Sequence, residues 1–178
     1  MLSFSSKTPV NLRPAEPSDQ RSVFDWLIDA YAGPYWCTEG APPSWEEFCA
    51  DYQDFFFDGS APEKGRVFII TRGKADTGAV SYDARFREPR EAEIDIWLAR
   101  EDLCSQGLGS EALKQLTVLL RKSLGLKRLI ISPCGKNARA VRAYEKSGFK
   151  QLKLPYHELQ SRFGPLECSH AIVMLQDL

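Results

Sequence analysis

One stretch of the chain, residues 93–149, decides the fold. It runs through five consecutive pieces: Glu93-Ile-Asp-Ile-Trp-Leu98, the loop Cys104-Ser-Gln-Gly-Leu-Gly109, an apolar-periodic segment to Leu124, Arg128-Leu-Ile-Ile-Ser132, and Asn137-Ala-Arg-Ala-Val-Arg-Ala-Tyr-Glu-Lys-Ser-Gly-Phe149. The first piece alternates, with Ile94, Ile96 and Leu98 on one face and Glu93, Asp95 and Trp97 on the other. This period of two predicts a half-buried strand. The whole stretch therefore predicts strand, glycine loop, helix, strand and helix.

The glycine loop opens a helix that has one apolar stripe. Its leucines recur in steps of three and four residues, at Leu113, Leu116, Leu119, Leu120 and Leu124. Free N–H groups at a helix N-terminus attract anions, and Gly107 and Gly109 would let a ligand approach the backbone closely. An ordinary turn would also explain the two glycines. Both common nucleotide fingerprints are excluded, because residue 112 is Ala and no Gly-Lys-Ser/Thr follows.

The last helix of the stretch presents a basic face. Its cations, at three- and four-residue spacing, are Lys136, Arg139, Arg142 and Lys146. Such a face is commonly just solvated, but beside a phosphate loop it could pair with phosphate groups. Tyr144 is the one hydroxyl on the body of this helix before Ser147.

These residues resemble the acetyl-CoA site of the GCN5-related N-acetyltransferase (GNAT) superfamily. The family pattern Arg/Gln-x-x-Gly-x-Gly/Ala aligns with residues 104–109, and Asn-x-x-Ala-x-x-x-Tyr-Glu-Lys-x-Gly-Phe aligns with residues 137–149. Cys104 stands where the family has Arg or Gln. Scattered likenesses in Phe24-Asp-Trp-Leu27, Tyr35-Trp36 and residues 94–98 are most similar to aminoglycoside 6′-N-acetyltransferases, and nearly as similar to siderophore and peptide N-acetyltransferases.

The resemblance implies acetyl-CoA as cosubstrate, with no metal. The implied cofactor-binding residues are the main chain of Trp97, Leu98 and Ala99, which would pair with pantetheine, the loop residues Cys104, Ser105, Gln106, Gly107, Leu108, Gly109 and Ser110, and Asn137, Ala140, Tyr144 and Lys146 of the last helix. A helix cap alone would also explain Asn137.

The resemblance also implies direct acetyl transfer to a primary amine, which must lose a proton before it attacks. Asp95 is the first candidate base and Glu93 the second, although both could simply alternate outward on a half-exposed strand. Tyr144 occupies the position of the family's general acid, and a phenol with a pKa of about 10 is protonated at neutral pH. Its alternative is a packing aromatic.

The acceptor site is the least defined part. Its candidate residues are Trp36, Glu39, Asp95 and Glu167, with Trp45 as a second aromatic wall. The segment 39–63 contains seven acidic residues and no cation before Lys64, which indicates either a solvated acidic surface or a wall that attracts a cationic substrate. The aminoglycoside enzymes have Asp-Pro-Ser where this chain has Ser132-Pro-Cys134, so one cation-binding carboxylate is missing here.

The composition of the chain limits the kinds of protein and of binding partner that we expect. The chain has 178 residues, a net charge of −1, 43% hydrophobic and 26% charged residues, and five scattered cysteines without a Cys-x-x-Cys motif. These values predict one globular domain over residues 1–178 in the cytoplasm, with no nucleic-acid, membrane or zinc partner. A homodimer is compatible with the resemblance.

The remaining segments complete an α+β fold. Strands are expected at 10–13, 66–72, 77–84, 151–156 and 167–175, helices after Ser18 and after Ser44, and a loop at 160–165. The expected architecture is the GNAT fold, a mixed and mostly antiparallel central sheet flanked by helices, whose central strands splay apart to admit acetyl-CoA. Two functions stay open: an N-acetyltransferase for a small cationic amine, another metabolite amine or a protein N-terminus, and a non-catalytic acetyl-CoA sensor.

Overall fold

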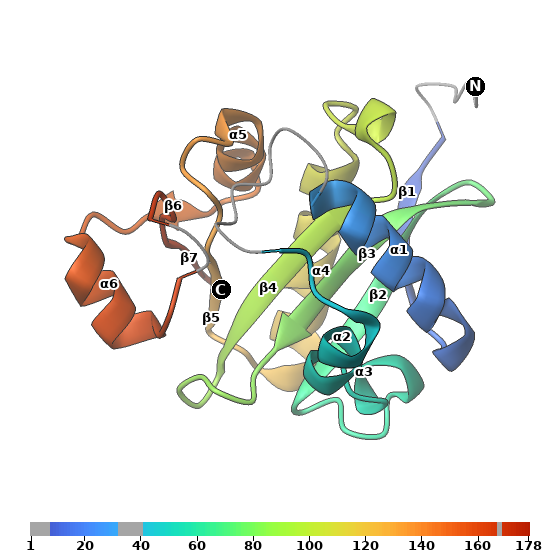
Figure 1. Ribbon diagram of the computed structural model, residues 1–178, viewed down its shortest axis with the longest axis horizontal. Helices are drawn as coiled ribbons and strands as arrows, with labels where there is room; N and C mark the ends of the chain where they lie inside the picture. Colours follow the sequence, from blue (N-terminus) through green and yellow to red (C-terminus); the bar gives the residue numbers. More distant parts are fainter. Residues whose placement is uncertain (1–7, 32–40, 167–168) are drawn as a thin grey trace.

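The computed structural model describes residues 8–31, 41–166 and 169–178 (Figure 1). Within these ranges one sheet has the strand order β1-β2-β3-β4-β5-β7-β6. Its strands are β1 (Val10–Pro14), β2 (Gly65–Arg72), β3 (Ala75–Asp83), β4 (Glu91–Leu98), β5 (Arg128–Ile131), β6 (Lys150–Gln151) and β7 (Met174–Asp177). The helices are α1 (Gln20–Tyr31), α2 (Trp45–Asp51), α3 (Phe55–Asp58), α4 (Leu108–Leu124), α5 (Ala138–Lys146) and α6 (Tyr156–Phe163), with short 3-10 turns at Pro17–Asp19 and Glu101–Leu103.

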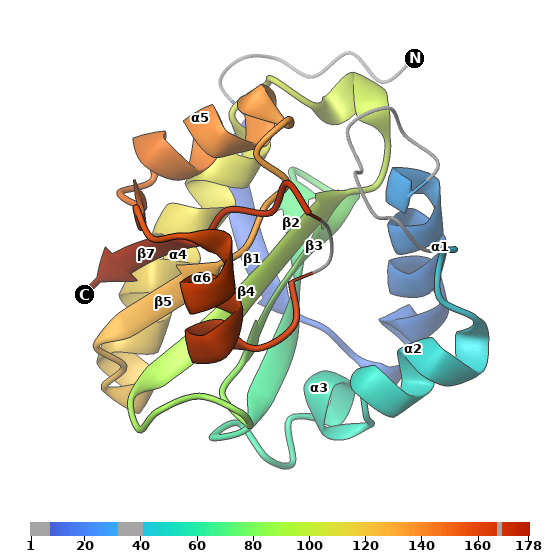
Figure 2. The same cartoon turned by 60° about the vertical axis from the view of Figure 1, so that its left-hand side comes forward.

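Helices cover both faces of the sheet (Figures 1 and 2). On one face, α4 places Leu113, Leu116 and Leu120 against Ile70 and Ile94, and all five side chains are buried. On the other face, α1, α2 and α3 form an aromatic cluster over β2, β3 and β4. The sheet is therefore the middle layer of three, as expected for an α+β domain.

The central strands diverge. β4 and β5 are parallel, and they pair only at Glu91–Arg128, Ala92–Leu129 and Glu93–Ile130. Beyond Glu93, β4 continues to Leu98 paired with β3 alone. The other pairs of neighbouring strands are antiparallel. The predicted mixed sheet with splayed central strands is confirmed, and one edge of β4 is left open to a ligand.

Trp97 corrects the predicted polar face of β4. Its side chain is only 5% exposed, and its indole N–H donates a hydrogen bond to the Val23 carbonyl of α1 at 3.2 Å. Because helices cover both faces of the sheet, alternation along β4 does not separate buried from exposed positions. The face that carries Glu93, Asp95 and Trp97 instead points toward the α1–α3 layer.

The flanking helices bear out some predictions and correct others. Ser44 caps α2 as expected, accepting the Glu47 N–H at 3.2 Å while the Glu47 carboxylate accepts the Ser44 N–H at 2.7 Å. The cap expected at Ser18 is wrong. Glu16 occupies that position, and its N–H is accepted by Asp19, which also pairs with Arg13 at 2.7 Å.

The C-terminal region differs most from the expected order. The strand expected at 151–156 is limited to Lys150–Gln151, and helix α6 replaces its last residue and the first four residues of the loop expected at 160–165. Leu159 and Phe163, four residues apart, pack against Ile130 and Val173. This spacing puts both on one helix face, a signal that the sequence contained. The closing strand begins only at Met174 and runs to Asp177.

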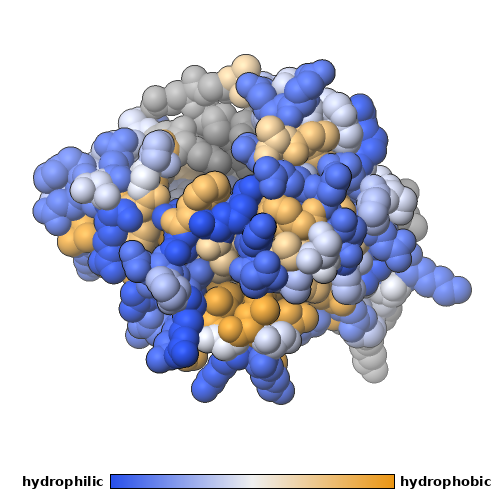
Figure 3. Space-filling view, turned by 90° about the horizontal axis from the view of Figure 1, so that it is seen from below, coloured by the Kyte–Doolittle hydropathy of each residue, from blue (hydrophilic) through white to orange (hydrophobic). Residues whose placement is uncertain are grey.

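The surface seen from below is largely hydrophilic, with separate apolar patches between the polar side chains (Figure 3). Phe86 is the most exposed large apolar side chain in the described ranges, at 80%. None of the helices described is both long and apolar enough to cross a membrane.

Candidate active site

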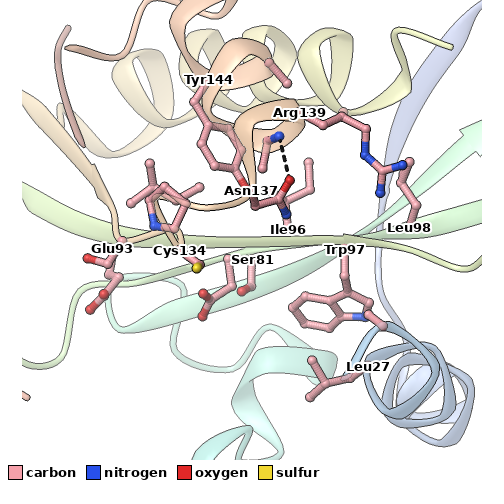
Figure 4. Close-up of a pocket in the computed structure, with 18 of the residues that line it drawn as sticks. Leu27, Ser81, Glu93, Ile96, Trp97, Leu98, Cys134, Asn137, Arg139 and Tyr144 are labelled. Atoms are coloured by element: carbon pink, nitrogen blue, oxygen red, sulfur yellow. Dashed lines mark hydrogen bonds between the residues drawn. The ribbon is translucent and has the colours of Figure 1, made fainter. Parts of the chain in front are cut away.

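A cavity of about 1090 Å³ opens where β4 and β5 diverge (Figure 4). One end of it is formed by α5 and by the residues 96–101, 104, 105, 107–111 and 114. Side chains from α1, α2, β3 and the start of β4 form the other, together with Phe163, Pro165 and Leu166. The two ends are called here the cofactor end and the acceptor end. The Tyr144 side chain extends from α5 and lies on one side of β4, whereas Trp97 and Leu27 lie on the other side.

The glycine loop lines the cofactor end. Gly107 has a left-handed backbone at φ 83°, and the non-glycine residue Ser105 is also left-handed at φ 61°. Helix α4 begins immediately afterwards at Leu108. Ser105, Gly107 and Gly109 line the cavity. The free N–H groups of a helix N-terminus thus lie where an anion can reach them, as a pyrophosphate requires.

Three cations of α5 face the same end. Arg139, Arg142 and Lys146 line the cavity, whereas Lys136 does not. Asn137 also lines it, and its Oδ1 accepts the Ala140 N–H at 3.0 Å, so it caps α5 (Figure 4). The Ala140 N–H is therefore engaged in the cap, and Ala140 offers the cavity its surface rather than a donor.

The open edge of β4 offers main-chain groups in alternation. The Ala99 N–H donates to the Thr77 carbonyl at 2.9 Å, so it faces β3. Successive residues direct their main-chain groups to opposite edges of a strand. Leu98 and Ile96 therefore face the open edge, whereas Trp97 and Ala99 face β3. Of the three residues expected to pair with pantetheine, Leu98 thus directs its main-chain groups to the open edge, whereas those of Trp97 and the N–H of Ala99 are turned toward β3.

Of the other loop residues, some line the cavity and some bond to other groups of the protein. Cys104 lines the cavity, and burial raises the pKa of its thiol, which the nearby Arg139 partly offsets. Ser110 also lines it, but its hydroxyl donates to the Ala143 carbonyl at 3.3 Å and joins α4 to α5. Gln106 was expected to contact the cofactor, yet it does not line the cavity: its side chain bonds to Arg72 and to the Asp102 carbonyl.

Tyr144 lies between the two ends. Its ring packs edge-on to Phe149 with centroids 6.3 Å apart, and it lines the cavity. Burial raises the pKa of Tyr144 above its ordinary value, and the negative charge of Asp95 raises it further. The phenol therefore keeps its proton at neutral pH, as a proton donor must.

Asp95 is exposed to the cavity and is held by a residue that the sequence did not indicate. The Tyr52 hydroxyl donates to Asp95 Oδ2 at 3.2 Å. Burial raises the pKa of Tyr52 well above 10, and the charge of Asp95 adds to this, whereas a hydrogen bond with Ser81 lowers it. Tyr52 follows α2, so the N-terminal layer reaches the candidate base.

Two carboxylates near Asp95 are engaged in ion pairs with arginines. Glu93 pairs with Arg87, whose other nitrogen donates to the Phe163 carbonyl at 3.0 Å. Asp83 pairs with Arg85 at 2.7 Å, and Arg85 also donates to the Asp51 carbonyl at 2.9 Å. Glu93 is thus committed to a cation, and Asp95 is the better candidate base. Asp83, Arg85 and Arg87 were not predicted from the sequence, because only the pairing of β3 with β4 brings them to the cavity.

The described part of the acidic segment 39–63 is an exposed acidic surface, the first of the two alternatives, and does not form a wall of the cavity. Among its described carboxylates only Asp51 lines the cavity. Glu47 caps α2, and Asp58 accepts the Ser60 N–H at 2.7 Å. Trp45 packs on Phe24 and Phe48 instead of lining the cavity. Trp36, Glu39 and Glu167 lie outside the described residues.

The charges of the cavity are polarised. At the cofactor end the described lining has five cations, Arg100, Lys114, Arg139, Arg142 and Lys146, against Glu101 and Glu111. At the acceptor end it has five carboxylates, Asp29, Asp51, Asp83, Glu93 and Asp95, against Arg85 and Arg87. The residues present therefore fit a phosphate-bearing cofactor at one end and a cationic ligand at the other.

Comparisons with known proteins find similar acetyltransferases. The curated aminoglycoside N(6′)-acetyltransferases type 1 of Klebsiella pneumoniae and Serratia marcescens are each 27% identical to the chain, over 83% of it and 77% of the relative. Aminoglycoside acetyltransferase AAC(6′)-Ib, solved with ribostamycin and coenzyme A, superposes with a TM-score of 0.67 at 22% identity, over 94% of this chain and 93% of that one. Spermidine N-acetyltransferase of Vibrio cholerae, solved with CoA and spermine, gives 0.71 at 19% identity, over 94% and 95%.

The match to a family settles the class of protein. Residues 10–150 match the acetyltransferase (GNAT) domain family, and this segment contains the loop, β4 and α5 from which the cofactor end is built. The chain is thus an acetyltransferase that uses acetyl-CoA, and it belongs to the GNAT domain family.

Proposed function

We propose that this enzyme transfers acetyl from acetyl-CoA directly to a primary amine of a small cationic acceptor, such as an aminoglycoside or a polyamine. The observation that carries the proposal is the polarised cavity, whose acceptor end has more carboxylates than guanidinium groups. A low-dielectric cleft with one sign of charge concentrates ligands of the opposite sign. Relatives and structural neighbours that act on aminoglycosides or spermidine support the same class of acceptor.

Each side chain has one task in this mechanism. Asp95, or a water that it holds, takes a proton from the acceptor's ammonium group, and the freed amine attacks the acetyl carbonyl. The new carbon–nitrogen bond forms and the carbon–sulfur bond breaks, and the attacking nitrogen, which still carries two protons, releases one of them to solvent. Tyr144 gives its proton to the departing sulfur and regains one from solvent, and its raised pKa keeps it protonated until that step.

The cofactor end binds and orients. The N–H groups of the α4 N-terminus and of the loop donate hydrogen bonds to the pyrophosphate, while Arg139, Arg142 and Lys146 neutralise phosphate charge. The open edge of β4 at Ile96 and Leu98 holds the pantetheine arm as an added strand would. Acetyl-CoA supplies the activated acetyl group when bound.

The test is acetyl-CoA turnover, followed by thiol release, with aminoglycosides, polyamines, amino acids and short peptides as acceptors. We expect turnover with a polycationic amine, lost by about 10²-fold or more in Asp95→Asn and Tyr144→Phe. Asp25→Asn is the matched control, because Asp25 is an exposed carboxylate on α1 that pairs with Arg21 outside the cavity. Turnover only with short peptides would replace the proposed acceptor by a protein N-terminus. Tight acetyl-CoA binding without any turnover would favour a sensor.

A further inference from the structure

A buried arginine that does not line the cavity forms a hydrogen bond to a residue of the glycine loop. Arg72 ends β2, is 8% exposed, and donates from Nη1 to Gln106 Oε1 at 2.8 Å. The other half of the Gln106 amide donates to the Asp102 carbonyl at 2.7 Å. Gln106 therefore bridges the sheet and the turn that precedes the loop, and both ends of its amide are engaged.

The bridge sits at the strained point of the loop. Gln106 lies between Ser105 at φ 61° and Gly107 at φ 83°. A left-handed backbone is disfavoured for a non-glycine residue such as Ser105, so surrounding contacts must hold it in place. Ser105 and Gly107 line the cavity, whereas Gln106 points away from it. The bridge is thus a side-chain contact placed directly between the two left-handed residues of the loop.

The residue at the first position of the loop motif makes the Arg72–Gln106 bridge more important in this protein. Cys104 replaces the usual Arg or Gln, and burial raises the pKa of its thiol, so it stays neutral and is a weak donor. The loop must then hold pyrophosphate chiefly through backbone N–H groups. Such donors are effective only when they are already oriented before the anion binds.

We propose that Arg72 is a positioning residue for the pyrophosphate of acetyl-CoA, acting through Gln106 to hold the loop in its anion-binding conformation. Arg72 does not line the cavity, so it does not touch the cofactor itself. The proposal rests on the acetyl-CoA site and is independent of which amine is the acceptor.

The experiment compares two acetyl donors. Acetyl-CoA contains the pyrophosphate, whereas S-acetylpantetheine ends before it. We expect Gln106→Leu and Arg72→Met each to lower kcat/KM for acetyl-CoA about tenfold relative to kcat/KM for S-acetylpantetheine, which corresponds to the loss of one hydrogen bond to a charged group. Arg72→Lys should restore part of the ratio, and the double variant should be no worse than the single ones.

Arg66→Met is the matched control, because Arg66 lies on the same strand and donates to the Ala15 carbonyl at 2.9 Å, away from the loop. It should lower stability without changing the ratio of the two donors. Gln106 is exposed, so Gln106→Leu remains informative if Arg72→Met fails to fold. An unchanged ratio in Gln106→Leu, or fully additive losses in the double variant, would overturn the proposal.

Discussion

The hydroxyl of Tyr52 donates a hydrogen bond to Asp95 Oδ2 at 3.2 Å, across 43 residues of sequence. Tyr52 is itself fixed by aromatic contacts, stacked on Phe48 at 5.0 Å and edge-on to Trp97 at 6.0 Å. The candidate base on β4 is therefore held by the helical layer that covers the acceptor end. Orientation of a base is a large part of its effect, because proton transfer needs hydrogen-bond geometry.

Tyr52→Phe should lower kcat/KM for the amine about tenfold while leaving the acetyl-CoA KM within about twofold. The ring and its packing remain, whereas the hydroxyl's hydrogen bonds to the Asp95 carboxylate and with Ser81 are lost. Steady-state kinetics with each substrate varied in turn measures both values. Tyr156→Phe, on the first turn of α6, is the control. Equal losses for both substrates would point to a general structural role.

Tyr144→Phe should lower kcat about 10²-fold with little change in the dissociation constant of acetyl-CoA. Removal of a positioned acid costs a factor of this order, whereas the ring still packs on Phe149. Calorimetric titration gives the affinity and thiol release gives the rate. If affinity fell as much as rate, Tyr144 would be a packing residue only.

Glu93→Gln should lower kcat less than threefold and destabilise the fold by about 1 kcal/mol, because it breaks the pair with the largely buried Arg87. Asp95→Asn should instead lower kcat strongly and leave the free energy of unfolding nearly unchanged. Denaturant unfolding beside kinetics separates the two. A rate loss in Glu93→Gln that matched Asp95→Asn would make Glu93 the base.

Gly78→Ala should destabilise the protein by about 3 kcal/mol. A Cβ at this position would lie 2.4 Å from the Trp97 carbonyl oxygen and 2.8 Å from Leu98 Cα, so β3 and β4 would have to separate. Gly109→Ala is the comparison in urea unfolding, since its Cβ would meet Ile96 Cδ1 at an ordinary 3.7 Å. Equal stability of the two variants would mean that the sheet adjusts freely at Gly78.

Alkaline pH should weaken the fold partly through Tyr82. Burial raises the pKa of Tyr82 to about 12, and its hydroxyl donates to the Pro62 carbonyl at 2.5 Å. A tyrosine in the unfolded chain titrates near 10, so between about pH 10 and 12 the native state holds the extra proton. The free energy of unfolding then falls by up to about 1.4 kcal/mol per pH unit from this group.

Tyr82→Phe should remove this part of the decline and give a shallower slope in urea unfolding over the same range of pH. Tyr156→Phe should keep the slope of the unaltered protein. A slope that does not change in Tyr82→Phe would assign the alkaline loss to the other buried tyrosines.

Local patterns predicted the cofactor half well. The loop, α4, β5 and α5 lie where period, glycines and the Asn137 cap indicated, because these elements are determined by contacts close in sequence. Strand β6 was predicted too long, at 151–156 instead of Lys150–Gln151, and helix α6 was missed. Leu159 and Phe163 give α6 its apolar face, but their partners Ile130 and Val173 are distant in the chain.

The acceptor end was predicted less well, and for the same reason. The described carboxylates of the segment 39–63 are exposed surface groups, whereas three of the five carboxylates at the acceptor end, Asp83, Glu93 and Asp95, come from β3 and β4. Trp97 lies on the polar side of its alternation and is nevertheless buried. Covering both faces of a sheet removes the solvent contrast on which an alternating pattern depends.

The sequence by itself determined the family, the acetyl-CoA loop, the helix cap at Asn137 and the acid–base candidates Tyr144 and Asp95, since each is carried by a local motif. Only the tertiary structure decided that Tyr52 holds Asp95, that Arg87 occupies Glu93, that Gln106 turns to Arg72, and that Leu98 rather than Trp97 faces the open edge. Each of these depends on strand register and layer packing, which join residues far apart along the chain.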